Sequence, residues 1–550
     1  MPLTSEMKRA ARIERRNIGP PTSDCAILNG RRRLATADGD GRSRPSDVRP
    51  PGAAVLISQP AAIRPATPVA APVAMGPNDG PSLSAERKGM STMTAAARFA
   101  DHVLGTRFTD LPAAVVERAK VFVLDSLGVG IAGSSVEGGE GLLRVASGWG
   151  IGPGDSAVPV WGRRARLAAP AAAFLNAWQM HNQEYDCLHE GAVVHAMAAV
   201  LPASLAAAEL RGGASGAELI AALAVGVDVA AGLGLASRSG FRFFRPGTAG
   251  GFGAVAAAGR LLGLDRPALE AAFAWQLAQA SGTMQAHTEG SPILPVQIAF
   301  NTRAALQSCE LAPLGFAAAH GVFEGPYGYL PLFEGTYDLE PVLASLGRQW
   351  RLAEFSHKPF PAGRATHGGI EGVRVLRAEH GFGAADVARV EVIAPPLIVR
   401  LVGRPPRPDA GASYARLCMA YAIAKTLQHG ALDLAHFRDE ALADPATYEL
   451  AARVETRDDG TTDPNALAPQ TVVVHLKDGR ALRWRGETML AHPARPLTRQ
   501  QHLEKFHRCL AFSAEPLAPG TAAALVEAVD ALEQMADVRG LAGLAARPVR

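Results

Sequence analysis

The segment from His181 to His195 carries the densest group of ionisable side chains in an otherwise apolar stretch. It reads His-Asn-Gln-Glu-Tyr-Asp-Cys-Leu-His-Glu-Gly-Ala-Val-Val-His and has Ala-rich sequence on both sides. If this connection is buried, each charged group requires a partner or a substrate to satisfy it. Histidine titrates near neutral pH and carboxylates pair with it, so the segment is predicted to perform acid–base chemistry.

Other interpretations of this segment are a solvated loop between helices and a metal site. Histidine and carboxylate side chains are suitable ligands for zinc or iron. The spacing matches neither HExxH nor a facial triad, so we predict no metal. Cys187 beside His189 could in principle act as a nucleophile, but one cysteine near one histidine is weak support.

A second group of cationic side chains lies between His357 and His367. The segment reads His-Lys-Pro-Phe-Pro-Ala-Gly-Arg-Ala-Thr-His. Its prolines fix φ and lower the entropy lost on ordering, so Lys358 and Arg364 are presented rigidly. Arginine binds a carboxylate through two parallel hydrogen bonds, and lysine acts as a compact charge. The segment is predicted to bind a carboxylate substrate; the alternative is a basic surface loop.

A third motif is the glycine-rich run from Pro246 to Gly253 at the start of a predicted helix. Free N–H groups at a helix N-terminus bind anions. No strand precedes the run, so it is neither a dinucleotide fingerprint nor a P-loop. Close packing of helices is the favoured interpretation.

The elements that must position these segments are mostly helices. From about 93 to 350 apolar residues recur with a helical period, with helices expected at 112–130, 168–180, 196–210, 216–234, 249–262, 267–281 and 297–312. From 351 to 497 strands at 389–394, 471–476 and 480–485 alternate with helices at 368–380 and 414–428. Helices return at 498–512 and 519–537. The fold class is therefore a mostly α protein, with an all-helical main domain (93–350 and 498–545) and an inserted smaller α+β lid domain (351–497).

Residues 1–89 are rich in Arg, Pro, Ser and Gly and show no periodicity, which predicts a disordered N-terminal extension or an upstream start wrongly chosen. The formal net charge of +3 on 550 residues excludes the strongly basic footprint of a nucleic-acid binder. The apolar stretch 219–236 carries Asp228 and several glycines, so a buried helix is expected rather than a membrane span. Five scattered cysteines indicate neither a disulfide framework nor a zinc site, and a cytoplasmic location is expected.

Taken together, these segments resemble the MmgE/PrpD family of 2-methylcitrate dehydratase and cis-aconitate decarboxylase. The likeness runs from about Ala95 to about Leu532, and its blocks are 118–133, 176–195, 247–264, 323–328, 358–367 and 414–421. The resemblance implies a helical domain with a smaller α+β lid, an active site between them that needs no cofactor, and a homodimer.

Site residues follow from the same resemblance, position by position. It implies that the catalytic residues are Glu184, Asp186, His189, His195 and Tyr421. It implies that the substrate-binding residues are Thr248, Lys358, Arg364 and His367. His195 is expected to take the proton, and Tyr421, His189 or Glu184 to protonate the leaving group.

The sequence departs from the family pattern at several of these blocks. The Asp-Thr pair that precedes a histidine in the family is Cys187-Leu188 here, and a family histidine is replaced by Phe244. The lysine and histidine of another block are Leu294 and Gln297. Two cationic substrate contacts are thus missing or relocated, with Arg242 and Arg245 near Phe244, which favours a less charged or differently shaped substrate while leaving the proton-transfer groups largely in place.

The expected activity is that of a lyase of the 2-methylcitrate dehydratase type. It would abstract the proton next to a carboxylate and eliminate water from a small hydroxy-polycarboxylic acid. An isomerase or epimerase, a decarboxylase, and a non-catalytic carboxylate-binding homologue remain the alternatives. The expected partners are a small carboxylate and a second copy of the chain, with no nucleic acid and no membrane.

Overall fold

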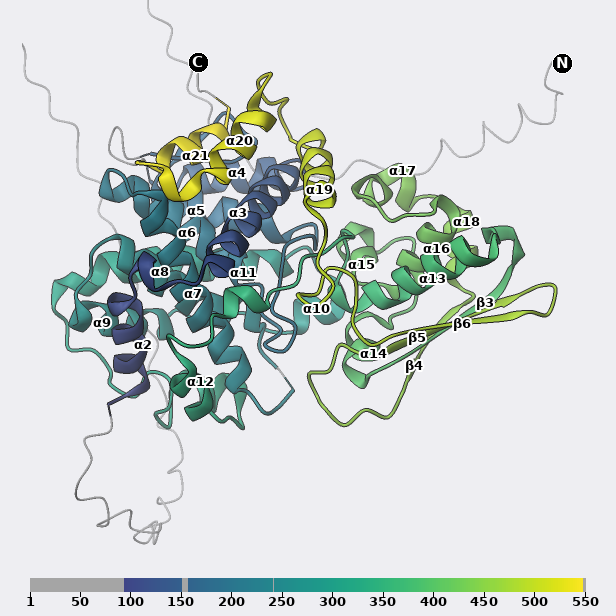
Figure 1. Ribbon diagram of the computed structural model, residues 1–550, viewed down its shortest axis with the longest axis horizontal. Coiled ribbons are helices and arrows are strands. Elements are labelled where there is room, and N and C mark those ends of the chain that lie inside the picture. Colours follow the sequence, from purple (N-terminus) through teal and green to yellow (C-terminus); the bar gives the residue numbers. More distant parts are fainter. Residues whose placement is uncertain (1–92, 151–156, 241, 548–550) are drawn as a thin grey trace, which may run out of the picture. The chain divides into compact units, whose positions relative to one another are not determined.

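Helices make up most of the chain that the structure describes, which comprises residues 93–150, 157–240 and 242–547 of a computed structural model (Figure 1). These residues belong to one unit, Arg87–Arg550. The extension predicted at 1–89 lies outside the described residues. The fold is mostly α, with a helical main domain and a smaller α+β domain, as the sequence predicted.

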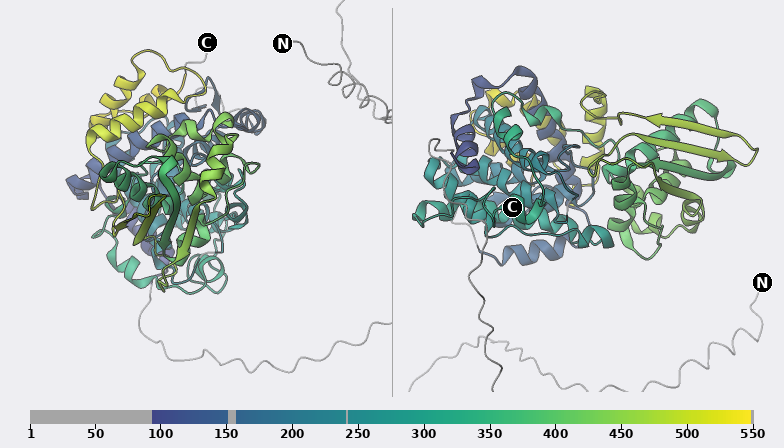
Figure 2. Two further views of the ribbon diagram at one scale, coloured as in Figure 1. Left: turned by 90° about the vertical axis from the view of Figure 1, so that its right-hand side faces the viewer. Right: turned by 90° about the horizontal axis from the view of Figure 1, so that it is seen from below.

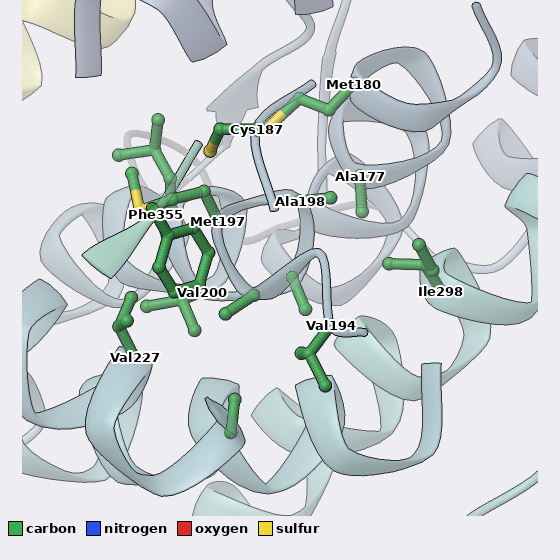
Figure 3. Close-up of a cluster of buried hydrophobic side chains, with 14 of the residues drawn as sticks. Ala177, Met180, Cys187, Val194, Met197, Ala198, Val200, Val227, Ile298 and Phe355 are labelled. Carbon is green, nitrogen blue, oxygen red and sulfur yellow. The ribbon is translucent and has the colours of Figure 1, made fainter. Parts of the chain in front are cut away.

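Five helices form the centre of the main domain. They are α5 (Ala169–His181), α6 (Ala196–Arg211), α7 (Gly216–Ala236), α8 (Arg245–Leu261) and α11 (Leu294–Leu311). Alanine, glycine and valine residues of these helices are buried on almost every face, as expected for helices at the centre of a domain. Figure 3 shows the core around α6, where Met197 and Val200 meet Val227 of α7 and Phe355.

The glycine-rich run at the start of α8 serves helix packing, as favoured from the sequence. A Cβ on Gly253 would lie 2.5 Å from the backbone oxygen of Gly226 in α7, and a Cβ on Gly226 would lie 2.8 Å from the oxygen of Gly253. Only glycine permits this approach of two backbones. Among the described residues α7 alone is long and apolar enough to span a membrane, and the window that passes this test is 94% buried inside the domain.

Further helices surround this centre. They are α2 (Ala95–Gly105), α3 (Ala113–Gly133), α4 (Gly139–Ser147), α9 (Arg266–Leu277), α10 (Gln285–Glu289) and α12 (Glu340–Ser345). A small hairpin pairs β1 (Val158–Pro159) with β2 (Arg166–Leu167). Capping side chains account for several starts; for example, Asp265 accepts a hydrogen bond from the backbone N–H of Ala268 at the start of α9.

The α+β domain has a four-stranded sheet in the order β4-β3-β5-β6. Its strands are β3 (Val387–Ala394), β4 (Val454–Asp458), β5 (Gln470–Leu476) and β6 (Ala481–Gly486). Only the β3–β4 pairing is parallel. The sequence did not predict β4. None of its five residues, Val-Glu-Thr-Arg-Asp, is buried, and the strand is stabilised by its pairing with β3 along one edge. The helices of this domain are α13 (His367–His380), α14 (Pro396–Val402), α15 (Gly411–Arg416), α16 (Met419–His429), α17 (Asp439–Leu442) and α18 (Pro445–Ala451).

The single helix predicted at 414–428 is wrong, because the chain breaks between α15 and α16. Cys418 has extended backbone angles, with φ −114° and ψ 109°. The carbonyl oxygen of Arg416 accepts a hydrogen bond from the N–H of Gly363 instead of continuing the helix. The break places Leu417 beside the segment that carries Lys358 and Arg364.

After β6 the chain returns to the main domain through α19 (Arg499–Ala511), α20 (Thr521–Asp530) and α21 (Arg539–Leu544). Helices α19 and α20 pack on α3, and α21 packs on α6 (Figures 1 and 2). The buried ammonium of Lys505 in α19 contacts Asp125 of α3 at 2.7 Å and donates to the backbone oxygen of Tyr185. Helix α19 thereby holds in place the 181–195 segment, which follows α5.

Candidate active site

The segment between α5 and α6 is held in an unusual backbone conformation. Glu184 and Val193 both have φ of 51°, a left-handed conformation that is uncommon for residues other than glycine and rare for β-branched ones. Cys187 and Val194 are anchored in the hydrophobic core (Figure 3). Such strain persists only where the surrounding structure enforces it, and it is concentrated at functional sites.

The same segment pairs directly with the chain that leads into the α+β domain. The N–H of Leu188 donates to the oxygen of Ser356 at 3.0 Å, and the N–H of Ser356 donates to the oxygen of Leu188 at 2.8 Å. This short bridge joins residues 168 positions apart and brings the groups after Ser356 next to those of the 181–195 segment.

Asp186 lies at the centre of the site and binds two imidazoles. Its carboxylate is fully buried, and the Nδ1 atoms of His181 and His195 lie 3.1 Å and 3.0 Å from its oxygens. A carboxylate only accepts hydrogen bonds, so both Nδ1 atoms carry the proton. Burial acts to raise the pKa of Asp186, but His195 and His181 together hold that pKa well below its usual value. Asp186 is therefore ionised at neutral pH.

The two histidines differ in charge. Burial lowers the pKa of His195, and Asp186 opposes that effect only in part. Neutral His195, protonated at Nδ1, presents the lone pair of Nε2, which has no hydrogen-bond partner among the described residues. Burial also acts to lower the pKa of His181, but Asp186 and Glu184 outweigh it and raise that pKa. One imidazole is thus set to accept a proton and the other to hold one.

Glu184 and Lys358 form a buried ion pair across the site. The Nζ of Lys358 donates to Oε2 of Glu184 at 2.8 Å and lies 3.9 Å from Oδ1 of Asp186. Burial acts to raise the pKa of Glu184, but Lys358 and the nearby histidines lower it to about 2. An ionised carboxylate has no proton to donate, so these contacts do not support the acid role that the sequence suggested for Glu184.

A cavity of about 60 Å³ lies beside these groups, although Asp186 and Lys358 are not among the residues that line it. His181, Glu184 and His195 line it from the main domain, and Arg364 lines it from the second domain. Arg364 is paired with Glu190 at 2.8 Å and donates to the oxygen of Leu490.

The donor set would also suit a cation. One ligand atom from each of His181, Asp186 and His195 lies within 4.8 Å of the others. In the present arrangement the oxygens of Asp186 are engaged by the two Nδ1–H groups, and the ammonium of Lys358 supplies positive charge nearby. The hydrogen bonds account for the geometry without further ligands.

Of the nine site residues expected from the sequence, the structure brings five together: Glu184, Asp186, His195, Lys358 and Arg364. His367 lies behind Arg364, with Nε2 bonded to the oxygen of Ala362, and takes no part in the lining. His189 points to Glu354, at 2.8 Å.

Two expected site residues lie elsewhere. The hydroxyl of Tyr421 donates to the oxygen of His436 at 2.6 Å, and Thr248 is bonded to the hydroxyl of Tyr329 at 3.1 Å. Neither residue is among those that line the cavity. The expectation that Tyr421 protonates the leaving group and that Thr248 contacts substrate does not agree with these contacts.

Sequence reasoning gave no role to two histidines that line the cavity, His181 and His287. His181 lies in the segment singled out from the sequence, and its position before the Glu-Tyr-Asp run was a usable signal. His287 is isolated in sequence on the short helix α10. Burial and then Arg404 lower the pKa of His287 to about 4, so its imidazole is neutral.

The fold thus combines a helical main domain with a smaller α+β domain, and a buried group of two histidines and one aspartate lies in the 181–195 segment. The chain belongs to the MmgE/PrpD family: the model of the MmgE/PrpD N-terminal domain matches residues 97–342, and that of the C-terminal domain matches residues 360–531. The relatives of this chain are enzymes.

Curated relatives are similar over most of their length. A cis-aconitate decarboxylase-like protein of Aspergillus oryzae is 28% identical over 73% of this chain and 87% of its own. The cis-aconitate decarboxylases of Mus musculus and Homo sapiens are 27% and 28% identical, over 82% of this chain and 93% and 94% of theirs. These matches support an organic-acid enzyme of the dehydratase or decarboxylase type.

Proposed function

We propose that this chain is a lyase that removes the proton next to a carboxylate in a small organic acid, with His195 as the base and no cofactor. The observation that carries the proposal is the hydrogen bond from Nδ1 of His195 to ionised Asp186. This bond fixes the tautomer and the ring orientation, so the lone pair of Nε2 is available beside the cavity.

The cationic groups supply the electrostatic part of the mechanism. A substrate carboxylate near Arg364 would place the adjacent carbon between His195 and Lys358. As the proton moves to Nε2 of His195, negative charge develops on the substrate carboxylate, and Lys358 and protonated His181 stabilise it. Such preorganised groups contribute about 2.7–4 kcal/mol for one donor in a well-measured case.

Elimination of water is the first candidate reaction. The α-proton goes to His195, the bond from the β-carbon to its hydroxyl breaks, and the hydroxyl leaves as water after taking a proton from His181. His181 replaces Tyr421, His189 and Glu184 as the proposed acid, because it borders the cavity and its pKa is raised.

Decarboxylation is the second candidate, and the names of the relatives favour it. The bond to a carboxylate breaks, carbon dioxide leaves, and the resulting carbanion takes a proton from a protonated histidine. The same two imidazoles serve this reaction, with the proton moving towards carbon rather than away from it.

Solvent deuterium uptake at the α-carbon tests the proposal. The full-length protein is incubated in D2O with a panel of hydroxy acids and unsaturated acids, and the carbon-bound hydrogens are followed by NMR. Ultraviolet absorbance of a new C=C bond and release of carbon dioxide, measured in parallel, separate the two candidate reactions. Binding of an acid with no exchange, no double bond and no carbon dioxide would contradict catalysis and favour a non-catalytic carboxylate-binding homologue.

A further inference from the structure

The imidazole of His287 lines the active-site cavity, although the acid–base steps proposed above do not use it. It lies on the short helix α10 and is buried. A buried histidine beside a cavity either binds both of its ring nitrogens to the protein or keeps one of them for a ligand. The contacts of the two nitrogens distinguish these cases.

One ring nitrogen of His287 faces an arginine. The Nη2 of Arg404 lies 3.5 Å from Nδ1 of His287 and donates to the backbone oxygen of the same residue at 2.8 Å. A guanidinium only donates hydrogen bonds, so the Nδ1 that faces it keeps its lone pair. Burial and then Arg404 lower the pKa of His287 to about 4. The imidazole is therefore neutral at neutral pH, and its one proton is on Nε2.

The proton on Nε2 of His287 has no acceptor in the part of the chain that the structure describes. Arg404, which faces Nδ1, is not among the residues that line the cavity, so the Nε2–H lies on the side of the ring that borders it. This arrangement is the reverse of that at His195, where Nδ1–H is bound to Asp186 and the lone pair of Nε2 remains. The cavity thus has one imidazole that can accept a proton and one that can donate a hydrogen bond.

Helix α10 is attached to the part of the wall where the family pattern has a histidine and this chain has Phe244. The N–H of Phe244 donates to the oxygen of Gly282 at 3.0 Å. The N–H of Met284 donates to the oxygen of Arg242, also at 3.0 Å. These bonds place the start of α10 beside the start of α8, and Phe244 and His287 both line the cavity. His287 therefore supplies this wall with the imidazole that Phe244 lacks.

We propose that His287 is a further catalytic residue, which donates its Nε2–H to the substrate carboxylate next to the carbon that loses its proton. The inference rests on the proposed function and adds a substrate contact to the same site. As the proton moves to His195, the electron pair of the C–H bond is delocalised onto the oxygens of that carboxylate. A fixed donor at these oxygens binds them more strongly in the transition state than in the bound acid, and a neutral imidazole can serve as that donor.

Substitution of His287 tests the contact. His287→Leu removes the donor and should lower kcat/KM for α-hydrogen exchange by about 10²-fold. In His287→Gln an amide N–H can take the place of Nε2–H, so kcat/KM should stay within about tenfold of wild type. The matched control is His502→Leu, because His502 is also buried with a pKa of about 4 but does not line the cavity. Its kcat/KM should stay within about twofold of wild type.

The pH profile separates a donor from a base. Because His287 is neutral throughout the neutral range, His287→Leu should lower kcat/KM by the same factor at every pH there, and the acid limb should keep its position. Circular dichroism establishes that each variant is folded. A wild-type rate in His287→Leu, a displaced acid limb, or equal losses in folded His287→Leu and His287→Gln would overturn the inference.

Nitrogen NMR of the full-length protein, labelled at its histidines with the heavy nitrogen isotope, tests the contact without turnover. The Nε2 signal of His287, assigned with His287→Gln, should be that of a protonated nitrogen and should shift on titration with acetate, citraconate or cis-aconitate. A proton on Nδ1, or no shift with any of these acids, would overturn the inference.

The two proposals fail in different ways. A protein that shows the shift at His287 but exchanges no α-hydrogen in any acid refutes the lyase and keeps the contact. A protein that exchanges an α-hydrogen equally well as wild type and as His287→Leu refutes the contact and keeps the lyase.

Discussion

Two groups of two histidines and one aspartate lie buried among the described residues, and they are built differently. The pocket triad comprises His181, Asp186 and His195; the back triad comprises Asp125, His357 and His502. In the pocket triad both imidazoles donate to the aspartate. In the back triad the aspartate is bound instead by Lys505 at 2.7 Å.

The unsatisfied atoms of the back triad make the contrast sharper. Oδ2 of Asp125, Nε2 of His357 and Nδ1 of His502 have no hydrogen-bond partner among the described residues. The ring of His357 stacks on Phe122, with ring centres 4.2 Å apart. Aromatic packing rather than a carboxylate therefore orients this imidazole.

The charge on the aspartate follows from these contacts. Burial raises the pKa of Asp125 despite Lys505, whereas the two imidazoles hold the pKa of Asp186 well below its usual value. Residue types alone do not make a proton-transfer site. The arrangement that we propose for proton transfer is an ionised carboxylate that fixes the tautomer of an imidazole beside a cavity, and in the part of the chain described only the pocket triad has it.

Loss of the pocket lysine should have the largest effect. Lys358→Met leaves two buried carboxylates, Glu184 and Asp186, without their ammonium group. Removal of one partner of a buried ion pair costs about 3–5 kcal/mol, and activity should be lost as well. Lys505→Met is the comparison in the back triad: it should cost less, because Asp125 can be protonated more readily. Equal losses of unfolding free energy in the two variants, measured by urea unfolding, would contradict the contrast between the two aspartates.

The pocket aspartate should control the pH dependence of catalysis. His195 must be neutral to act as a base, and Asp186 raises its pKa against the effect of burial. Asp186→Asn should lower kcat/KM by about 10²-fold or more and move its acid limb to lower pH. In Asp125→Asn the position of that limb should not change. A pH profile of Asp186→Asn that matches wild type would remove Asp186 from its role.

The back triad should affect stability rather than catalysis. Burial and then Lys505 lower the pKa of His502 to about 4, so the unfolded chain binds a proton between pH 6.5 and 4 that the folded chain does not. This group therefore makes the wild type lose stability as the pH falls through that range. Over the same pH range the free energy of unfolding of His502→Gln should fall by about 1–2 kcal/mol less than that of the wild type, after allowance for solvent screening. Thermal melts at several pH values across this range measure the change in stability. A loss of stability in the variant as large as that of the wild type would contradict the expectation.

The smallest effect is expected at the tyrosine that sequence reasoning placed in the site. Tyr421→Phe removes a hydrogen bond to the oxygen of His436 and should cost about 0.5–1.5 kcal/mol, with turnover within about twofold of wild type. A loss of kcat comparable to that of Asp186→Asn would return Tyr421 to the mechanism.

The sequence predicted the helical core and the main part of the site, because both depend on strong local patterns. The helical period gave α5, α6 and α7 within a few residues, and the family resemblance assigned Lys358 and Glu184 to one site although 174 positions separate them. The clustering of ionisable groups around Asp186 marked the segment that the structure shows to be strained.

The features that the sequence could not predict depend on the direction in which side chains point in three dimensions. Tyr421 lies on α16, and the break at Cys418 sets which way that helix faces, a feature with no glycine or proline to announce it. His287 enters the cavity from a five-residue helix and belongs to no cluster in sequence. Asp186 and Glu184 raise the pKa of His181, whereas burial and Lys358 lower that of His195 despite Asp186, and neither environment is visible in the sequence.

The most direct test of the central claim compares wild type with His195→Gln for deuterium uptake at the α-carbon of whichever acid the wild type exchanges. If Nε2 of His195 accepts the substrate proton, the variant should exchange about 10²–10⁴-fold more slowly, with a melting temperature close to that of wild type. Uptake at the wild-type rate by a folded His195→Gln protein would contradict it.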